Sequence, residues 1–196
     1  MFYRIYVKRF LDVIISLIAF PFILVIAIPI SLAIKIEDGG SVFFLGKRYG
    51  KDMKKFNMFK FRSMKMNAAD IRNADGTTFN SADDARQTKV GRILRKTSLD
   101  ELPQFFNVLI GDMSLIGPRP SPMGNEATYT EFVRKKFNVR PGITGYNQAL
   151  KRNKSTLEER YKNDVYYAEN ISFGLDLKIL LLTIKGVLLR KNIYRS

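Results

Sequence analysis

The sequence contains no cysteine, no histidine and no tryptophan in its 196 residues. Without histidine, the most common general base is absent, and neither a Ser-His-Asp nor a Cys-His nucleophilic system can be built. Without cysteine and histidine, a disulfide scaffold is excluded and a tetrahedral zinc site is not expected. If the chain is an enzyme, carboxylates must therefore carry the proton transfer, the nucleophilic attack or the binding of a hard metal such as Mg²⁺.

Acidic residues are scarce as well: 18 aspartates and glutamates stand against 33 lysines and arginines, for a net charge of +15. Such an excess indicates an anionic partner, which can be nucleic acid, anionic lipid headgroups or a phosphorylated substrate. The length suits one domain with a core of its own. Within it, Asp100 and Glu101 are neighbours in the stretch SLDELP at residues 98–103. They are the first candidates for a carboxylate site.

One long apolar run makes a membrane the first anionic surface to consider. Residues 13–34 carry no charge, and as a helix they would extend roughly 33 Å, enough to cross a bilayer core of about 30 Å. The run is too long for a cleaved signal peptide, and no small-residue cleavage site follows it. A buried soluble helix is the remaining alternative. We predict a membrane helix.

Two features argue against a simple membrane span. Pro21 and Pro29 lie inside the run, and each removes a backbone donor. Basic residues flank the run on both sides, among them Arg4 and Lys35, so both flanks prefer the cytoplasm. A re-entrant helix that enters and leaves through the same face satisfies both flanks, whereas a spanning helix satisfies one. We predict the re-entrant form, with a bend at Pro21 or spread over both prolines.

The region after the apolar run begins with a predicted β-hairpin. Residues 41–49 and 54–64 are rich in strand-forming side chains and are joined by a short turn. Strand periodicity places Lys60 and Arg62 on one face and the neighbouring phenylalanines on the other, so the basic face either binds a ligand or is simply solvated. Residues 65–89 are polar and rich in turn signals, and we expect a helix fragment and a surface loop there.

The acidic pair lies at a predicted helix start. Ser98 and Glu101 have the spacing of a capping box, and an apolar row from Leu102 to Ile110 has helical spacing. Capping alone would explain these acidic residues, since they stabilise a helix start by roughly 0.3–1 kcal/mol. A helix start also binds anions, and a carboxylate there has a lowered pKa and stays ionised, which suits a nucleophile. Both interpretations stay open for Asp100 and Glu101.

Two proline-containing turns each carry an arginine. Arg119 lies between Pro118 and Pro120, and Arg140 precedes Pro141. The prolines restrict the backbone, so each guanidinium extends from a rigid support; the plainer interpretation is a surface arginine on a stiff loop. Glycines in both turns permit a close approach of the backbone.

A last apolar row near the C-terminus has helical spacing. By default such a helix packs in the core, and the alternative is a helix lying in the membrane interface. Its members are Leu177, Leu180, Leu181, Ile184, Val187 and Leu188.

The motifs follow one another in a recognisable order: KRFLD at 8–12, KFRSM at 60–64, SLDELPQ at 98–104, NVL at 107–109, GDMS at 111–114, GPRP at 117–120 and RPGITG at 140–145. This order resembles the bacterial sugar transferase family, the monotopic polyprenyl-phosphate phosphoglycosyl transferases, in their minimal catalytic form. The resemblance covers nearly the whole chain. One departure concerns the bend of the membrane helix, where many members have a Ser-Pro pair and this chain has Leu24 and Val25.

The resemblance implies the transfer of sugar-1-phosphate from a UDP-sugar to undecaprenyl phosphate, with release of UMP, in the first membrane step of surface glycan assembly. It implies that Asp100 attacks the β-phosphate to form a covalent phosphosugar intermediate, and that Glu101 helps to bind Mg²⁺. Phosphoryl transfer depends mainly on positioning and electrostatic stabilisation, so it does not require histidine. The cations expected to line the phosphate site are Lys60, Arg95 and Arg119, with Arg62 and Arg140 as weaker candidates.

The expected fold is α+β and mostly helical. A re-entrant membrane helix at residues 1–36 precedes a catalytic domain at residues 37–196 with a small β-hairpin and amphipathic interfacial helices. The catalytic domain would lie on the cytoplasmic face of the bacterial inner membrane, with anionic lipids as partners, no nucleic acid, and a homodimer left open. The alternatives are a membrane-anchored protein that binds anionic lipid or nucleic acid without chemistry, and an inactive partner in a glycan-assembly complex.

Overall fold

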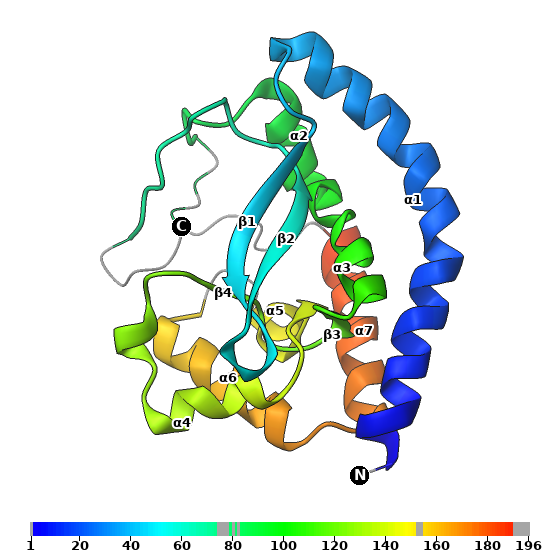
Figure 1. The fold of residues 1–196 in the computed structure, drawn as a ribbon, viewed down its shortest axis with the longest axis vertical. Coiled ribbons are helices and arrows are strands. Elements are labelled where there is room, and N and C mark those ends of the chain that lie inside the picture. The colour runs from blue at the N-terminus through cyan, green and yellow to red at the C-terminus, as the bar shows by residue number, and fades with distance from the viewer. Residues whose placement is uncertain (1, 74–78, 80, 82, 152–154, 190–196) are drawn as a thin grey trace.

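The computed structural model describes residues 2–73, 79, 81, 83–151 and 155–189. It is mostly helical with two small sheets, which confirms the predicted fold class. The long helix α1 follows one side of the molecule, and the hairpin β1–β2 lies at its centre (Figure 1). The elements are a π-helical turn η1 (Tyr3–Val7), α1 (Lys8–Asp38), β1 (Phe43–Tyr49), η2 (Lys51–Met53), β2 (Lys55–Phe61), α2 (Lys89–Thr97), η3 (Leu99–Glu101), α3 (Gln104–Ile110), β3 (Ser114–Ile116), β4 (Ser121–Pro122), η4 (Glu126–Thr128), α4 (Glu131–Arg134), η5 (Lys135–Asn138), β5 (Gly142–Thr144), α5 (Tyr146–Lys151), α6 (Leu157–Glu169) and α7 (Phe173–Leu188).

The apolar run forms the uninterrupted helix α1, which is long and apolar enough to cross a membrane. Pro21 and Pro29 lie inside α1 without breaking it, and the helix curves around the body (Figure 1). The bend predicted at Pro21, or spread over both prolines, therefore does not interrupt the helix, because the chain continues in helical conformation past each proline. Gly39, in the left-handed conformation at φ +68°, ends the helix.

Both ends of α1 are attached to the same globular body. Near its start, Arg9 Nη1 donates to the Val108 carbonyl at 2.7 Å, at the end of α3. The buried carboxylate of Asp12 accepts a hydrogen bond from the Leu115 N–H at 3.0 Å, so this residue is not a surface charge. Most apolar side chains between the ends are exposed. The far end packs on β2 and α2 through the buried cluster of Ile30, Ile34, Phe61 and Leu94.

The predicted hairpin is confirmed. β1 and β2 pair in antiparallel register from Phe43 opposite Phe61 to Tyr49 opposite Lys55, and β4 extends the sheet on the other side of β1. The inward-facing Met58 of β2 packs on Val108 of α3 and on Met113, which follows that helix. β2 is therefore fixed between α1, α2 and α3, and it carries Lys60 toward the acidic pair.

The acidic pair does not lie in a capping box, so that prediction is wrong. Ser98 takes the left-handed conformation at φ +61° and ends α2, and its side chain caps no helix. Asp100 and Glu101 lie on the short turn η3 that follows, and α3 begins only at Gln104, after Pro103. Because Ser98 closes the preceding helix, its hydroxyl is not placed to start the next one.

The polar region after β2 is irregular. In the described part of residues 65–88 no helix is present, so the expected helix fragment is not found. Residues 74–78, 80 and 82 of this prediction lie outside the described part. A bridge between Met64 and Gln87 closes the region.

The apolar row of α7 points mostly away from the core, so core packing is the wrong default for it. Ile179 and Asp176 are buried, against β3 and α6. This leaves the interfacial alternative for the exposed side chains of Phe173, Leu177, Leu180, Leu181, Ile184 and Val187.

Candidate active site

A cavity of about 600 Å³ opens beside the acidic pair. Its walls come from the end of α2, from η3, from the start of α3, from α5 and from the last turns of α7. One part of the lining is charged and another is apolar, which suits a ligand with both characters. Its charged lining residues are Lys60, Arg95, Asp100, Glu101, Arg119, Arg160 and Lys185, and its apolar ones include Leu99, Leu102, Phe105, Leu182 and Val187.

Two cations bind Glu101 through a single oxygen. Lys60 Nζ donates to Glu101 Oε1 at 2.6 Å, and Arg119 Nη2 donates to the same oxygen at 3.2 Å. Burial alone would raise the pKa of Glu101, but the charges and hydrogen bonds of Lys60 and Arg119 outweigh it and lower the pKa to about 2. The other oxygen, Oε2, accepts no hydrogen bond from the described part of the chain.

Asp100 lies beside this cluster and receives no hydrogen bond from the described residues. Lys60 Nζ is its closest cation, 3.8 Å from Oδ2. Burial raises the pKa of Asp100 and outweighs the attraction of Lys60, and the negative charge of Glu101 raises it further. The lowered pKa expected for a carboxylate at this helix start is thus wrong for Asp100. The pKa of Glu101 is lowered, but by two cations. Within the described residues the pair therefore consists of one carboxylate that two cations hydrogen-bond and one that has only a longer ion pair with Lys60.

The turn that carries Arg119 is held by a very close approach of two backbones. β3 and β5 pair in parallel, and the Gly142 N–H donates to the Pro118 carbonyl at 2.9 Å. A Cβ atom on Gly142 would lie 2.0 Å from the backbone nitrogen of Gly117, so only glycine fits there. The predicted close approach is confirmed, and it supports the arginine that reaches Glu101.

The structure brings some of the predicted cations to the cavity and places others elsewhere. Arg95, in the last turn of α2, lines the cavity with Lys60 and Arg119. Arg62 lies outside the cavity lining, buried in an ion pair with the carboxylate at the end of α1. Arg140 is also outside it, where its Nε donates to the Gly111 carbonyl at 2.8 Å, just past the end of α3.

Sequence reasoning missed several cations near the site. Arg160 of α6 lines the cavity, and no motif in the sequence singles it out. Arg48 of β1 lies near Arg119; burial first, then the charges of Arg119 and Arg72, lowers its pKa to about 10. The hairpin register could have indicated Arg48, because two-residue periodicity places it on the same sheet face as Lys60.

The two carboxylates of the site could hold a divalent cation only together with further ligands. In the part of the chain that the structure describes, no group of three or more acidic residues could hold a metal. Mg²⁺, however, is commonly bound by one or two carboxylates together with substrate phosphates and water. Glu101 Oε2 and the carboxylate of Asp100 supply such a partial donor set beside three cations.

Comparison with known proteins connects this geometry to a family. The model of the bacterial sugar transferase family matches residues 3–190. The chain belongs to this family. The resemblance indicated by the order of the motifs is thus confirmed. An uncharacterized sugar transferase of Bacillus subtilis is 44% identical over 163 residues, which are 83% of this chain and 78% of that relative.

Two longer relatives of the transferase have more specific names. A galactosyl transferase of Streptococcus agalactiae is 41% identical, and the match covers 93% of this chain and 42% of that relative. A UDP-glucose:undecaprenyl-phosphate glucose-1-phosphate transferase of Klebsiella pneumoniae is 39% identical, with 95% of this chain and 41% of the relative covered. The chain therefore spans less than half the length of these two proteins.

Proposed function

We propose that the chain is a phosphoglycosyl transferase that moves sugar-1-phosphate from a UDP-sugar to undecaprenyl phosphate, releases UMP and so initiates the assembly of a surface glycan. The observation that carries the proposal is the difference between the two carboxylates. Glu101 is bound by Lys60 and Arg119, whereas Asp100 is free of hydrogen bonds within the described residues and lines the cavity. The names of the relatives support the substrates, because they describe transfer from UDP-sugars to undecaprenyl phosphate.

The reaction proceeds in two displacements. Asp100 attacks the β-phosphorus of the UDP-sugar, the bond from that phosphorus to the bridging oxygen breaks, and UMP leaves with the bridging oxygen. A phosphate oxygen of undecaprenyl phosphate then attacks the phosphorus of the aspartyl-phosphosugar, and the Asp100 carboxylate is released unchanged. No general base is required, because both nucleophiles are already anions. This agrees with a chain that has no histidine.

Positive charges around the pair stabilise the transferred group. Lys60, Arg95 and Arg119 line the cavity and neutralise charge on the phosphate oxygens. When the diphosphate binds, Lys60 and Arg119 donate some of their hydrogen bonds to the diphosphate oxygens in place of Glu101. Glu101 Oε2 and the substrate would hold Mg²⁺, which supplies further charge neutralisation at the diphosphate.

The membrane provides the lipid acceptor on the same side as this site. Both ends of α1 are attached to one body, which supports a re-entrant helix. The basic residues on both flanks favour the cytoplasmic face for the catalytic domain. The exposed apolar row of α7 supports a second contact with the membrane interface. The net charge of +15 favours anionic lipids and the polyprenyl phosphate.

The experiment separates the two displacements. With UDP-sugar alone, purified protein should release one UMP per chain and gain the mass of the phosphosugar; Asp100→Asn should do neither. Asp52→Asn, in the exposed hairpin turn, is the matched control and should behave as the parent. EDTA should stop UMP release, and Glu101→Gln should raise the Mg²⁺ concentration that is needed.

Two outcomes would contradict the proposal. Full transfer by Asp100→Asn would exclude this residue as the nucleophile. If the parent protein released no UMP from any of a panel of UDP-sugars in the presence of undecaprenyl phosphate, the chain would be a membrane-anchored binding protein instead.

A further inference from the structure

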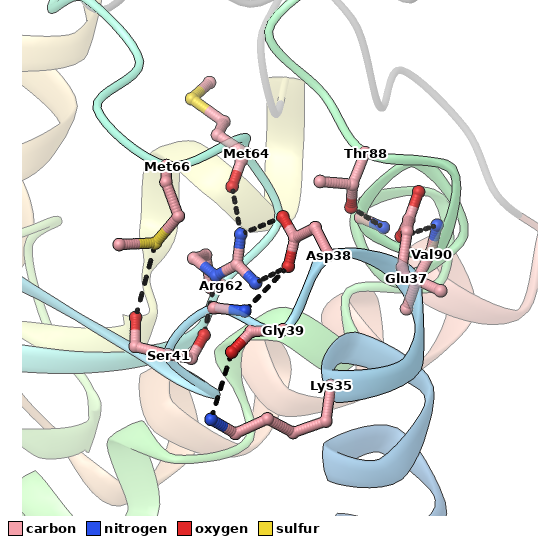
Figure 2. A network of polar contacts seen from close by, with 12 residues as sticks. Lys35, Glu37, Asp38, Gly39, Ser41, Arg62, Met64, Met66, Thr88 and Val90 are labelled. Carbon is pink, nitrogen blue, oxygen red and sulfur yellow. Dashed lines mark hydrogen bonds and ion pairs between the residues drawn. The ribbon is translucent and has the colours of Figure 1, made fainter.

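The last two residues of α1, Glu37 and Asp38, bind two separate elements of the body (Figure 2). Asp38 binds the guanidinium of Arg62 in a two-pronged ion pair: Nη1 donates to Oδ2 at 2.6 Å, and Nη2 donates to Oδ1. Arg62 is 5% exposed, and it also donates to the carbonyls of Ser41 and Met64. The guanidinium thus joins the end of α1 to the end of β2 and to the neighbouring loops.

Glu37 caps a different element from outside. The Lys89 N–H donates to Glu37 Oε1 at 2.5 Å, and the Val90 N–H donates to Oε2 at 3.0 Å. The hydroxyl of Thr88 accepts the Gly91 N–H at 2.8 Å (Figure 2). The first N–H groups of a helix lack partners within it, and here two of them are bound by a side chain of another helix. The start of α2 is therefore fixed to α1.

Both attached elements lead directly to the acidic pair. β2 carries Lys60, two residues before Arg62, and the ammonium of Lys60 binds Glu101 at 2.6 Å. α2 carries Arg95 in its last turn and continues into η3, which holds Asp100. The buried apolar cluster beneath α1 contains side chains from the same two elements. A displacement of either attachment would thus be transmitted to the cations of the site.

We propose that Glu37 and Asp38 are positioning residues for phosphoryl transfer: by binding α2 and β2, they hold Arg95 and Lys60 in place around the acidic pair. The inference rests on the proposed function. Phosphoryl transfer depends on positioning, and a misplacement of about 1 Å can cost about a hundred-fold in rate. The helix α1 then has two roles: its apolar length contacts the membrane, and its last turn sets the geometry of the site.

The test uses the full chain in nanodiscs. Glu37→Gln and Asp38→Asn should each lower kcat about ten-fold or more, with little change in the KM for the UDP-sugar, because the donor still binds among the cations. Asp38→Glu keeps the charge and should recover part of the loss; it also serves if Asp38→Asn does not fold. Glu169→Gln, in an exposed ion pair, is the matched control and should stay within two-fold of the parent.

Double variants distinguish positioning from simple destabilisation. If Asp38 acts through Lys60, Asp38→Asn should add less than two-fold to the loss in Lys60→Gln and keep its full effect in Arg95→Gln. Glu37→Gln should show the reverse pattern. Losses that multiply in all four combinations, or parental kcat in both single variants, would overturn the proposal.

Hydrogen exchange separates this inference from the proposed function. Glu37→Gln should speed amide exchange at residues 89–101, and Asp38→Asn should speed it at residues 55–62; unchanged exchange in both would also overturn the positioning role. If the parent released no UMP, the proposed function would fail, while the exchange data would still show whether the two carboxylates hold α2 and β2.

Discussion

Replacing Glu101 by glutamine removes the negative charge that binds Lys60 and Arg119 but keeps the shape of the side chain. Against the effect of burial, these cations lower the pKa of Glu101 from 4.5 to about 2. The difference corresponds to about 3 kcal/mol of folding stability, present in full above pH 4.5 and lost as the pH falls toward 2. In a chain of this size, about 1 kcal/mol shifts the melting temperature by about 2–4 °C. Glu101→Gln should thus lower it by roughly 6–12 °C at pH 7.

Asp100 should respond in the opposite direction. Burial outweighs Lys60 and raises the pKa of Asp100, so the ionised carboxylate destabilises the folded protein at neutral pH. Asp100→Asn should therefore leave the melting temperature unchanged or raise it, while it abolishes transfer. A gain in stability with a loss of activity is the behaviour expected of a reactive group whose burial costs the fold stability.

The assay is thermal unfolding in nanodiscs at pH 7, without donor and with EDTA, so that no bound ligand adds stability. Glu169→Gln should shift the midpoint by little, since exposed ion pairs contribute about 0–1 kcal/mol. An unchanged midpoint for Glu101→Gln, or shifts of the same sign for the two site variants, would refute the reasoning about their charges.

Other changes test the packing and the topology. Gly142→Ala should destabilise the chain by about 1–3 kcal/mol or more in unfolding experiments, because its Cβ would lie 2.0 Å from the Gly117 nitrogen. Lys136→Met should lower the free energy of unfolding in urea by about 3–5 kcal/mol, because it leaves the buried carboxylate of Asp164 without its ion pair. Replacing both Lys136 and Asp164 by apolar residues should recover most of this loss. Cysteines introduced at Tyr3 and Ser41, in a chain that has no other cysteine, should both be shielded from an impermeant reagent in intact cells. Labelling of only one would indicate a spanning helix.

Elements that depend on one contiguous segment could be predicted. The apolar run and the two-residue alternation were enough for α1 and the hairpin, because hydrophobic length and strand periodicity act locally. The capping box shows where local patterns fail. Ser98 and Glu101 have the same spacing as Thr156 and Glu159, but the box forms only at Thr156. Ser98 does not cap the next helix because the preceding helix, α2, ends at Ser98 itself.

The sequence by itself narrowed the chemistry open to this protein: the absence of histidine and cysteine pointed to carboxylates, and the excess of cations pointed to an anionic substrate. The tertiary structure decided which carboxylate the cations bind, and which arginine serves the site. Arg119 reaches Glu101, whereas Arg62 is bound by Asp38 at the end of the long apolar helix α1. The physical reason is that ion pairing and burial depend on distances between segments far apart in the chain, which no local pattern encodes.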